Sequence, residues 1–309
     1  MRILILGGDG MLGHRLLMHL QQEHDVRVTL RRELTDYYPH AQYGLFTQEN
    51  SYTGVEVRDM GRLLEVMADF RPEAVVNAVG IIKQREAAKE AIPSLEINSL
   101  LPHRLTLLCS ATGARLVHMS TDCVFSGCRG NYTEDDVADA EDLYGRTKLL
   151  GEVSQPGCVT LRTSIIGLEL SSGKKKKTGL IEWFLAQRGE IRGFTNAIYT
   201  GLTTAEMSRV IERVLLEHPE LSGLWQVASA PINKYDLLVR FSEVLGRRDI
   251  EIIPDDAVKI DRSLVPVAFE NATGYSAPRW DEMLEELGAE VRQRHKRERR
   301  FGSREGSRG

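Results

Sequence analysis

The chain has 309 residues, of which 42% are hydrophobic and 27% are charged, and its formal net charge is −4. This composition is typical of a globular protein, and the slightly acidic balance gives no reason to expect a nucleic-acid partner. No apolar stretch is long enough to cross a bilayer, and the first residues lack the basic region and apolar core of a secretion signal, so we expect a cytoplasmic protein with no membrane partner.

Strand-like and helix-like segments alternate through the first half of the chain. Short apolar runs bounded by polar residues or glycines predict strands at Arg2–Leu6, Val26–Leu30, Val55–Val57, Ala74–Val79, Leu116–Met119 and Val159–Ile166. Apolar residues at helical spacing predict helices at Met11–Leu20, at Glu86–Cys109 with an interruption at Pro102, and at Leu143–Val153. This alternation predicts an α/β fold with a doubly wound parallel sheet covered by helices on both faces.

The pattern changes after Gly167. An exposed loop is expected over Ser171–Lys177, and further elements are expected at Gly179–Arg188, Thr203–Leu216, Leu224–Val227, Asn233–Leu245, Glu251–Ile253 and through Trp280–Leu287. We therefore predict a Rossmann domain over residues 1–166 with returns from about 195–228, and an interleaved, smaller substrate lobe over residues 167–290. Residues 291–309 are strongly basic and have no apolar face, which predicts a disordered tail.

A glycine-rich turn follows the first strand. The segment GGDGMLG at residues 7–13 fits both GxGxxG and GxxGxxG. Glycines permit a tight turn there, and they let backbone amides and the helix N-terminus approach a pyrophosphate. Because a strand precedes the motif and a helix and a second strand follow it, we predict a dinucleotide site. The expected contacts are Gly7, Gly10, Met11, Leu12 and Gly13.

The end of the second strand discriminates between the two nicotinamide dinucleotides. An NAD site usually has a carboxylate there, which bonds the ribose 2′-hydroxyl, whereas this chain has Arg31 and Arg32. Guanidinium groups suit a 2′-phosphate. We therefore favour NADP(H) as the cofactor and keep NAD(H) as the alternative.

A tyrosine and a lysine four residues apart follow in the chain. On a helix Tyr144 and Lys148 share one face. We expect the ammonium to lower the phenol pKa, so that the pair exchanges a proton with a carbonyl or alcohol oxygen while a nicotinamide exchanges hydride. An amphipathic helix with a surface lysine is the simpler alternative.

These features together resemble the extended branch of the short-chain dehydrogenase/reductase family. Four segments are similar to dTDP-4-dehydrorhamnose reductases and related sugar-nucleotide reductases: STDCVFSG (120–127), YTEDD (132–136), YGRTKLLGE (144–152) and LRTSIIG (161–167). The resemblance covers about residues 1–290 and is stronger in the first 165. It implies an NADPH-dependent reductase of a nucleotide-linked 4-keto-6-deoxy sugar, in deoxysugar and cell-surface polysaccharide biosynthesis, with hydride delivered to C4.

The resemblance also implies roles for individual residues. Thr121 would hydrogen-bond the substrate carbonyl, Tyr144 would donate the proton, and Lys148 would hold the nicotinamide ribose and tune Tyr144. Tyr144 and Lys148 would both contact the cofactor, and further cofactor contacts would come from Asp59, Met60, Asn77, Ala78, Val79 and Gly80. Substrate contacts would come from Lys83, Thr121, Asp122, Cys123, Thr163 and Arg262.

Cys123 departs from the family pattern, in which STDYVF is usual. Reductases of UDP-linked 4-keto-6-deoxy amino sugars match this segment at least as well as the rhamnose enzymes do. Cys123 leaves open an epimerase-reductase with a cysteine base, although the histidine that such enzymes use is absent between His118 and His218. A dehydratase is disfavoured, because Cys123 stands where that group has its glutamate base.

Two further matters stay open. A non-catalytic subunit resembling the regulatory subunit of methionine adenosyltransferase could keep the same motifs, and a homodimer is compatible with the sequence.

The four cysteines show no CxxC pair and no metal-like spacing with histidine, so we expect reduced thiols and no metal site.

Overall fold

A computed structural model describes residues 1–37, 44–82, 90–170 and 179–305 of the chain. Its main element is a seven-stranded sheet in the order β10-β6-β5-β4-β1-β2-β3. All neighbouring strands in this sheet pair in parallel. The strands are β1 (Arg2–Leu6), β2 (Asp25–Thr29), β3 (Ser51–Tyr52), β4 (Ala74–Asn77), β5 (Arg115–Met119), β6 (Cys158–Arg162) and β10 (Gly223–Gln226).

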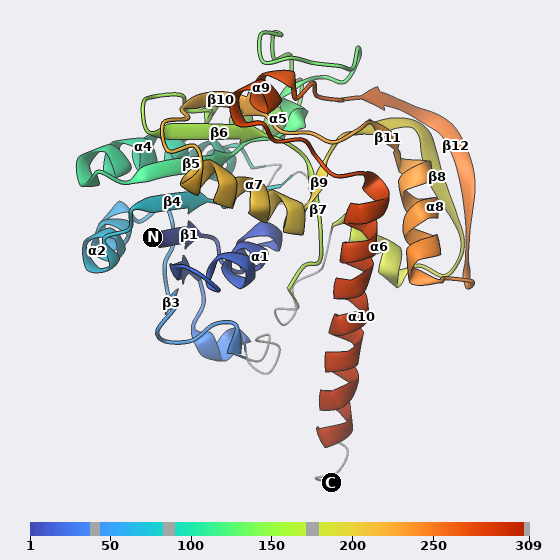
Figure 1. Ribbon diagram of the computed structural model, residues 1–309, viewed down its shortest axis with the longest axis horizontal. Helices are drawn as coiled ribbons and strands as arrows, with labels where there is room; N and C mark the ends of the chain where they lie inside the picture. The colour runs from blue at the N-terminus through green and yellow to red at the C-terminus, as the bar shows by residue number, and fades with distance from the viewer. Residues whose placement is uncertain (38–43, 83–89, 171–178, 306–309) are drawn as a thin grey trace.

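Helices cover both faces of this sheet, as Figure 1 shows. One face carries α1 (Met11–Leu20) and α7 (Thr204–Leu216), and the other carries α2 (Met60–Phe70) and α4 (Leu101–Thr112). Alternate residues of a strand point to opposite faces, so Ile3 and Ile5 pack with α1 and α7, while Leu4 and Leu6 pack with α2 and α4. The predicted doubly wound parallel sheet is therefore confirmed.

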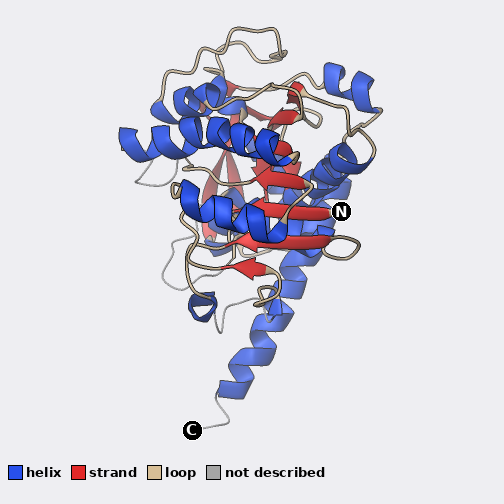
Figure 2. Cartoon of the chain, turned by 90° about the vertical axis from the view of Figure 1, so that its left-hand side faces the viewer, coloured by secondary structure: helices blue, strands red, loops and turns tan. Residues whose placement is uncertain are grey.

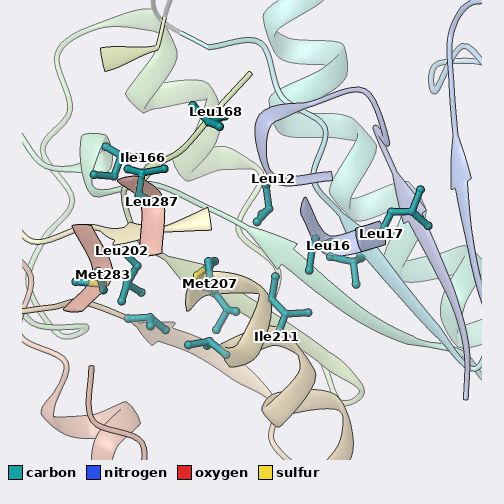
Figure 3. Close-up of a cluster of buried hydrophobic side chains, with 14 of the residues drawn as sticks. Leu12, Leu16, Leu17, Ile166, Leu168, Leu202, Met207, Ile211, Met283 and Leu287 are labelled. Atoms are coloured by element: carbon teal, nitrogen blue, oxygen red, sulfur yellow. The ribbon is translucent and has the colours of Figure 1, made fainter. Parts of the chain in front are cut away.

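The first core continues beyond the sheet into the second half of the chain (Figure 3). It joins leucines of α1 to residues of β7 (Ile165–Ile166), β9 (Leu202–Thr203), α7 and α10 (Trp280–Glu305). Met283 and Leu287 of α10 are fully buried there. The cofactor helix α1 and the C-terminal helix are therefore parts of one hydrophobic core.

A second, smaller sheet forms the lobe at the right of Figure 1. Its strand order is β11-β8-β12. The lobe comprises β8 (Gly189–Tyr199), β11 (Ile232–Asn233) and β12 (Ile250–Asp261), with α6 (Leu180–Ala186), α8 (Lys234–Leu245) and α9 (Val267–Thr273) in the same part of the chain. Strand β8 and most of β12 are absent from the predicted elements, because their residues alternate imperfectly and are largely polar.

Two predicted elements in the first half differ from the structure. The backbone at Val55–Val57 is not a strand: the edge strand is β3, and both valine side chains are buried in the core beside α2. The predicted break at Pro102 is also wrong. The described helix starts at α3 (Ala91–Ser94), passes through a π-helical stretch at Leu95–Leu100 and continues as α4, in whose first turn a proline is tolerated.

The prediction of a disordered tail is wrong for residues 291–305. Helix α10 extends to Glu305, and its C-terminal part projects from the body of the molecule (Figures 1 and 2). Val291 is buried, and Arg294 pairs with the buried Glu182 of α6. These anchors, together with the high helix propensity of arginine and glutamate, account for the helix. Residues 306–309 and the predicted loop at Ser171–Lys177 lie outside the described residues.

No helix in the described ranges is both long and apolar enough to cross a membrane.

Candidate active site

The glycine-rich turn connects β1 to α1 at the carboxyl edge of the sheet, where open α/β folds bind their ligands. Gly7 has φ +84°, and a Cβ at Gly13 would lie 2.1 Å from the carbonyl oxygen of Gly7. The backbone amide of Gly8 donates to the carbonyl of Thr29 at the end of β2 (3.0 Å). Gly10 begins α1 in an extended conformation without a side-chain cap. The turn therefore presents a side-chain-free cradle at a helix N-terminus, which fits the pyrophosphate of a dinucleotide.

The loop after β4 lies against this turn. A Cβ at Gly7 would be 2.9 Å from Val79 Cγ2 and 3.6 Å from the backbone of Ala78. Asn77 is fully buried: its Oδ1 accepts from the amide of Val79 (3.2 Å), and its Nδ2 lies 3.1 Å from His118 Nδ1. Asn77 thus holds the loop in place, and the loop through Gly80 forms the second side of the predicted cofactor cradle.

The remaining predicted cofactor residues flank the cradle. Arg31 and Arg32 are exposed just after β2. Asp59 is the N-cap of α2, accepting from the amide of Arg62 (3.0 Å), and Met60 packs against the second core. A structural role is therefore sufficient to explain Asp59, whereas the two arginines are free to face a ligand from solvent.

Thr121 begins the turn that follows β5. Its Oγ1 caps the turn by accepting from the amide of Cys123 (3.2 Å), and it donates to the carboxylate of Asp122 (3.1 Å). Both Thr121 and Asp122 are buried. The Thr121 hydroxyl lies near enough to the Tyr144 phenol to act on its pKa, so the hydroxyl and the phenol predicted to act together lie in the same site.

Tyr144 and Lys148 lie on α5 (Leu143–Leu150), which Asp142 caps through the amide of Gly145 (2.8 Å). Lys148 is buried, and its ammonium donates to the carbonyl of Met119 at the end of β5 (2.6 Å). This bond fixes the helix against the strand that leads to Thr121. Burial lowers the pKa of Lys148 to about 8, and the charge of Glu152 opposes that shift.

The expected lowering of the Tyr144 pKa is wrong for this structure. Burial raises the pKa of the phenol above its ordinary value, the neighbouring Cys123 and Asp122 raise it further, and only the hydrogen bond with Thr121 opposes the rise. The Lys148 ammonium is directed to Met119 instead. Tyr144 is therefore protonated at neutral pH, as a proton donor must be.

Of the other predicted substrate residues, Arg262 and Cys123 lie near this pair. Arg262, just after β12, donates from Nε to the carbonyl of Phe125 (2.7 Å), which brings it to the Thr121 turn. Burial raises the pKa of the Cys123 thiol to about 12, and Asp122 raises it further, whereas Arg262 lowers it. Thr163 is buried at the end of β6 and donates to the carbonyl of Ser164 (3.2 Å). Lys83 lies outside the described residues.

Sequence reasoning missed two features of the site. Glu152 forms a buried ion pair with Arg162 and accepts from Ser120. Tyr199, the last residue of β8, has a solvent-shielded hydroxyl close to Asp122 and Cys123. Glu152 lies inside the segment YGRTKLLGE (144–152) and could have been identified from it. No local sequence pattern marks Tyr199, because its strand is polar and irregular.

The chain matches a family model described as the RmlD substrate binding domain over residues 1–227. It is 24% identical to the spore coat polysaccharide biosynthesis protein SpsK of Bacillus subtilis over 75% of this chain and 74% of that protein. It is 28% identical to the methionine adenosyltransferase 2 subunit beta of Mus musculus over 49% of this chain and 41% of that protein. It is 30% identical to the dTDP-4-dehydrorhamnose reductase of Streptomyces griseus over 49% of this chain and 43% of that protein. The chain thus spans less than half the length of the latter two.

Among solved structures, the chain is similar to the dTDP-4-dehydrorhamnose reductase of Bacillus anthracis, crystallised in complex with NADP. The TM-score is 0.72 at 19% sequence identity, covering 94% of this chain and 99% of that chain. This likeness shows the fold. The family model covers most of the chain and includes every motif on which the predicted chemistry depends. The chain therefore belongs to the RmlD family, the dTDP-4-dehydrorhamnose reductase-like group of the extended short-chain dehydrogenases/reductases, which are NAD(P)-dependent oxidoreductases.

Proposed function

We propose that the chain reduces the 4-keto group of a nucleotide-linked 6-deoxy sugar with NADPH, in deoxysugar and cell-surface polysaccharide biosynthesis. The observation that carries this proposal is the placement of the Thr121 hydroxyl beside a protonated Tyr144, with Lys148 one helical turn further on and bonded to the end of β5, at the carboxyl edge of the sheet. This arrangement is suited to hold a carbonyl oxygen and to protonate it.

The chain's own residues account for the proton transfer. Thr121 and Tyr144 would both hydrogen-bond the carbonyl oxygen, which orients the carbonyl carbon toward the cofactor cradle. A bound nicotinamide supplies the hydride. Tyr144 gives its proton to the oxygen as the negative charge develops there. The resulting phenolate would be stabilised by the hydroxyl of Thr121. We assign Lys148, whose ammonium is held at the end of β5 by the carbonyl of Met119, to the nicotinamide ribose.

The cofactor and substrate would contact opposite sides of this pair. Gly7, Gly10 and Gly13 would hold the pyrophosphate, and Arg31 and Arg32 would hold the 2′-phosphate that distinguishes NADPH from NADH. On the other side, Arg262 offers a guanidinium to the nucleotide diphosphate. The site thus has a group for each charged part of both molecules.

The two alternative functions have less support. At neutral pH the thiol of Cys123 is protonated, because burial raises its pKa to about 12, and this argues against a thiolate base for epimerisation. The similarities to the methionine adenosyltransferase subunit and to the Streptomyces griseus reductase cover the same share of this chain, 49%, so our preference for the reductase rests on the side chains of Thr121, Tyr144 and Lys148. A homodimer stays a prediction.

The decisive experiment is Tyr144→Phe. The chain would be incubated with NADPH and a panel of dTDP-, GDP- and UDP-linked 4-keto-6-deoxy sugars, and NADPH oxidation would be followed. Loss of the proton donor should lower kcat by about 10²–10⁴-fold while NADPH affinity changes less than about twofold. Tyr52→Phe is the matched control, because that phenol hydrogen-bonds Arg27 and Asp69 at the sheet edge rather than any predicted catalytic residue. Unchanged turnover in Tyr144→Phe would refute the mechanism, and no turnover by the unmodified chain would refute the function.

A further inference from the structure

Glu152 lies just beyond the C-terminal end of α5. Its two carboxylate oxygens accept from Nε and Nη2 of Arg162, each at 2.8 Å, and one of them also accepts from Ser120 Oγ at 2.7 Å. The side chains are 10% and 4% exposed for Glu152 and Arg162 respectively. The ion pair is bidentate and nearly buried, and both carboxylate oxygens of Glu152 accept from donors on fixed elements. The pair is therefore rigid.

The network connects the elements that carry the proton-transfer groups. Ser120 directly precedes Thr121, and Arg162 is the last residue of β6. The residue before Ser120, Met119, accepts from the ammonium of Lys148 (2.6 Å). Two consecutive residues at the end of β5 are thus bonded to two residues of the α5 segment, and these bonds fix Tyr144 relative to Thr121.

Glu152 also acts on the charge of Lys148. Burial alone disfavours the ammonium, and among the described residues Glu152 is the acidic side chain whose charge raises the pKa of Lys148. The other titratable groups around Lys148 supply no negative charge at neutral pH. His118 of β5 is neutral, since burial and the charge of Lys148 hold its pKa well below the usual range. Arg162 of β6 is cationic and Tyr144 of α5 is protonated.

We propose that Glu152 is a positioning residue for the proton-transfer pair: through Arg162 and Ser120 it sets the register of α5 against the end of β5, and it places a carboxylate four residues beyond the buried Lys148. The role of Lys148 in holding the nicotinamide ribose is the one given under the proposed function. In the described part of the chain, the side-chain hydrogen bonds of Glu152 go to Arg162 and Ser120 and not to the cofactor cradle or the phenol.

The test is Glu152→Gln, which keeps the size and one acceptor oxygen but removes the charge. The pKa of Lys148 would be measured directly by NMR of ¹³Cε-lysine, with the signal assigned from Lys148→Met. We expect the pKa to fall by about one unit or more, as is usual when an opposite charge is removed from a buried site. Because only the ammonium binds the ribose well, NADPH affinity in the unmodified chain should fall as pH rises through about 8. In Glu152→Gln, the fall of NADPH affinity with rising pH should begin about one pH unit lower. NADPH binding should then be about fivefold weaker than in the unmodified chain at pH 8 and little changed at pH 6.

Two further variants separate positioning from folding. Glu152→Asp keeps the charge and should restore most of the Lys148 pKa. Glu152→Gln combined with Arg162→Met leaves no unpaired guanidinium in the core, which guards against misfolding, and it should still show the lowered Lys148 pKa. A Lys148 pKa within about 0.3 unit of the unmodified value in both charge-removing variants would overturn the proposal and leave Glu152 a structural residue. The titration of Lys148 needs no substrate, so its outcome does not depend on whether the chain reduces a sugar nucleotide.

Discussion

The two sides of the candidate site are built in different ways. The glycine-rich turn of the cofactor cradle is seven consecutive residues, Gly7–Gly13, whose shape is fixed by backbone contacts within the turn and with β2. The substrate side is assembled from remote segments: Arg262 reaches the carbonyl of Phe125 across 137 positions of sequence, and Tyr199 arrives on β8 of the second lobe. One side depends on local geometry and the other on tertiary packing.

This difference decides how each side responds to change. A backbone-built cradle fails when a single atom is added, because backbone atoms cannot move aside as a flexible side chain does. A side assembled from remote side chains loses one interaction at a time, since each group is held by its own element. The effects of substitutions on the two sides should therefore differ in magnitude and in the property that they change, which is stability or the affinity for one ligand.

Gly13→Ala is expected to have the largest effect. The added Cβ would lie 2.1 Å from the carbonyl oxygen of Gly7 and 2.9 Å from its carbonyl carbon, so the turn must open. We expect about 3 kcal/mol or more of lost unfolding free energy and loss of NADPH binding, measured by urea denaturation and fluorescence titration. Gly10→Ala is the matched control: its Cβ would meet only the Gly7 oxygen, at 3.2 Å, and should cost less than about 1 kcal/mol. Equal stabilities of the two variants would contradict the backbone-built cradle.

Arg262→Met tests the substrate side. Charge-assisted hydrogen bonds contribute about 1.5–3 kcal/mol, so the KM for the sugar nucleotide should rise about 10- to 100-fold. Affinity for free UDP or dTDP should fall by a similar factor, and NADPH affinity should stay unchanged. Arg129→Met is the control, because that guanidinium is exposed and paired with Asp136. If NADPH affinity falls as much as sugar-nucleotide affinity, the two sides are not separable in the way described here.

The same contrast explains what could be predicted from the sequence. The order β1-α1-β2 and the residues of the cradle follow from local periodicity and glycine spacing, and the structure places them within one or two residues of the predicted bounds. The pairing of Thr121 with Tyr144 follows from motifs at the ends of successive elements. The upward pKa shift of Tyr144 could not be predicted, because it depends on how deeply α5 packs against β5.

Segments whose structure depends on distant partners were not predicted. Strand β8 is polar and alternates poorly, and it is ordered by pairing with β12 and β11. Beyond Val291 the C-terminal helix has no apolar face of its own, and it is held there by the pairing of Arg294 with Glu182. A single sequence contains the residues of such pairs but does not show which of them meet.

Replacing Arg31 or Arg32 by alanine should have an effect of intermediate size, and the affected property should be NADPH binding. Both side chains are exposed, so solvent screening weakens each contact with a 2′-phosphate. We expect the KM for NADPH to rise about tenfold, or about 1.4 kcal/mol, while the KM for NADH changes less than about twofold. Steady-state kinetics with each cofactor measures the ratio. Equal changes for NADPH and NADH would exclude these arginines from 2′-phosphate recognition.

Tyr199→Phe should have the smallest effect on the unfolding free energy, and the sign of that change shows whether the hydroxyl has a structural partner. The Tyr199 hydroxyl is shielded from solvent and has no hydrogen-bond partner among the residues that the structure describes. Its ring packs on Trp280 at a centroid distance of 5.7 Å, a contact that phenylalanine keeps. Removing an unsatisfied buried hydroxyl should leave the unfolding free energy unchanged or raise it by up to about 1 kcal/mol.

Tyr275→Phe makes the same chemical change with the opposite expected sign. The Tyr275 hydroxyl donates to the buried carboxylate of Glu206 (2.9 Å), so its loss should lower the unfolding free energy by about 1–3 kcal/mol. Urea denaturation of both variants gives the comparison. If Tyr199→Phe is destabilised as much as Tyr275→Phe, the Tyr199 hydroxyl has a structural partner. If it is not, and sugar-nucleotide turnover nevertheless falls, the orphaned hydroxyl is kept for the ligand, because a group that costs stability in the free protein is retained for what it does in the complex.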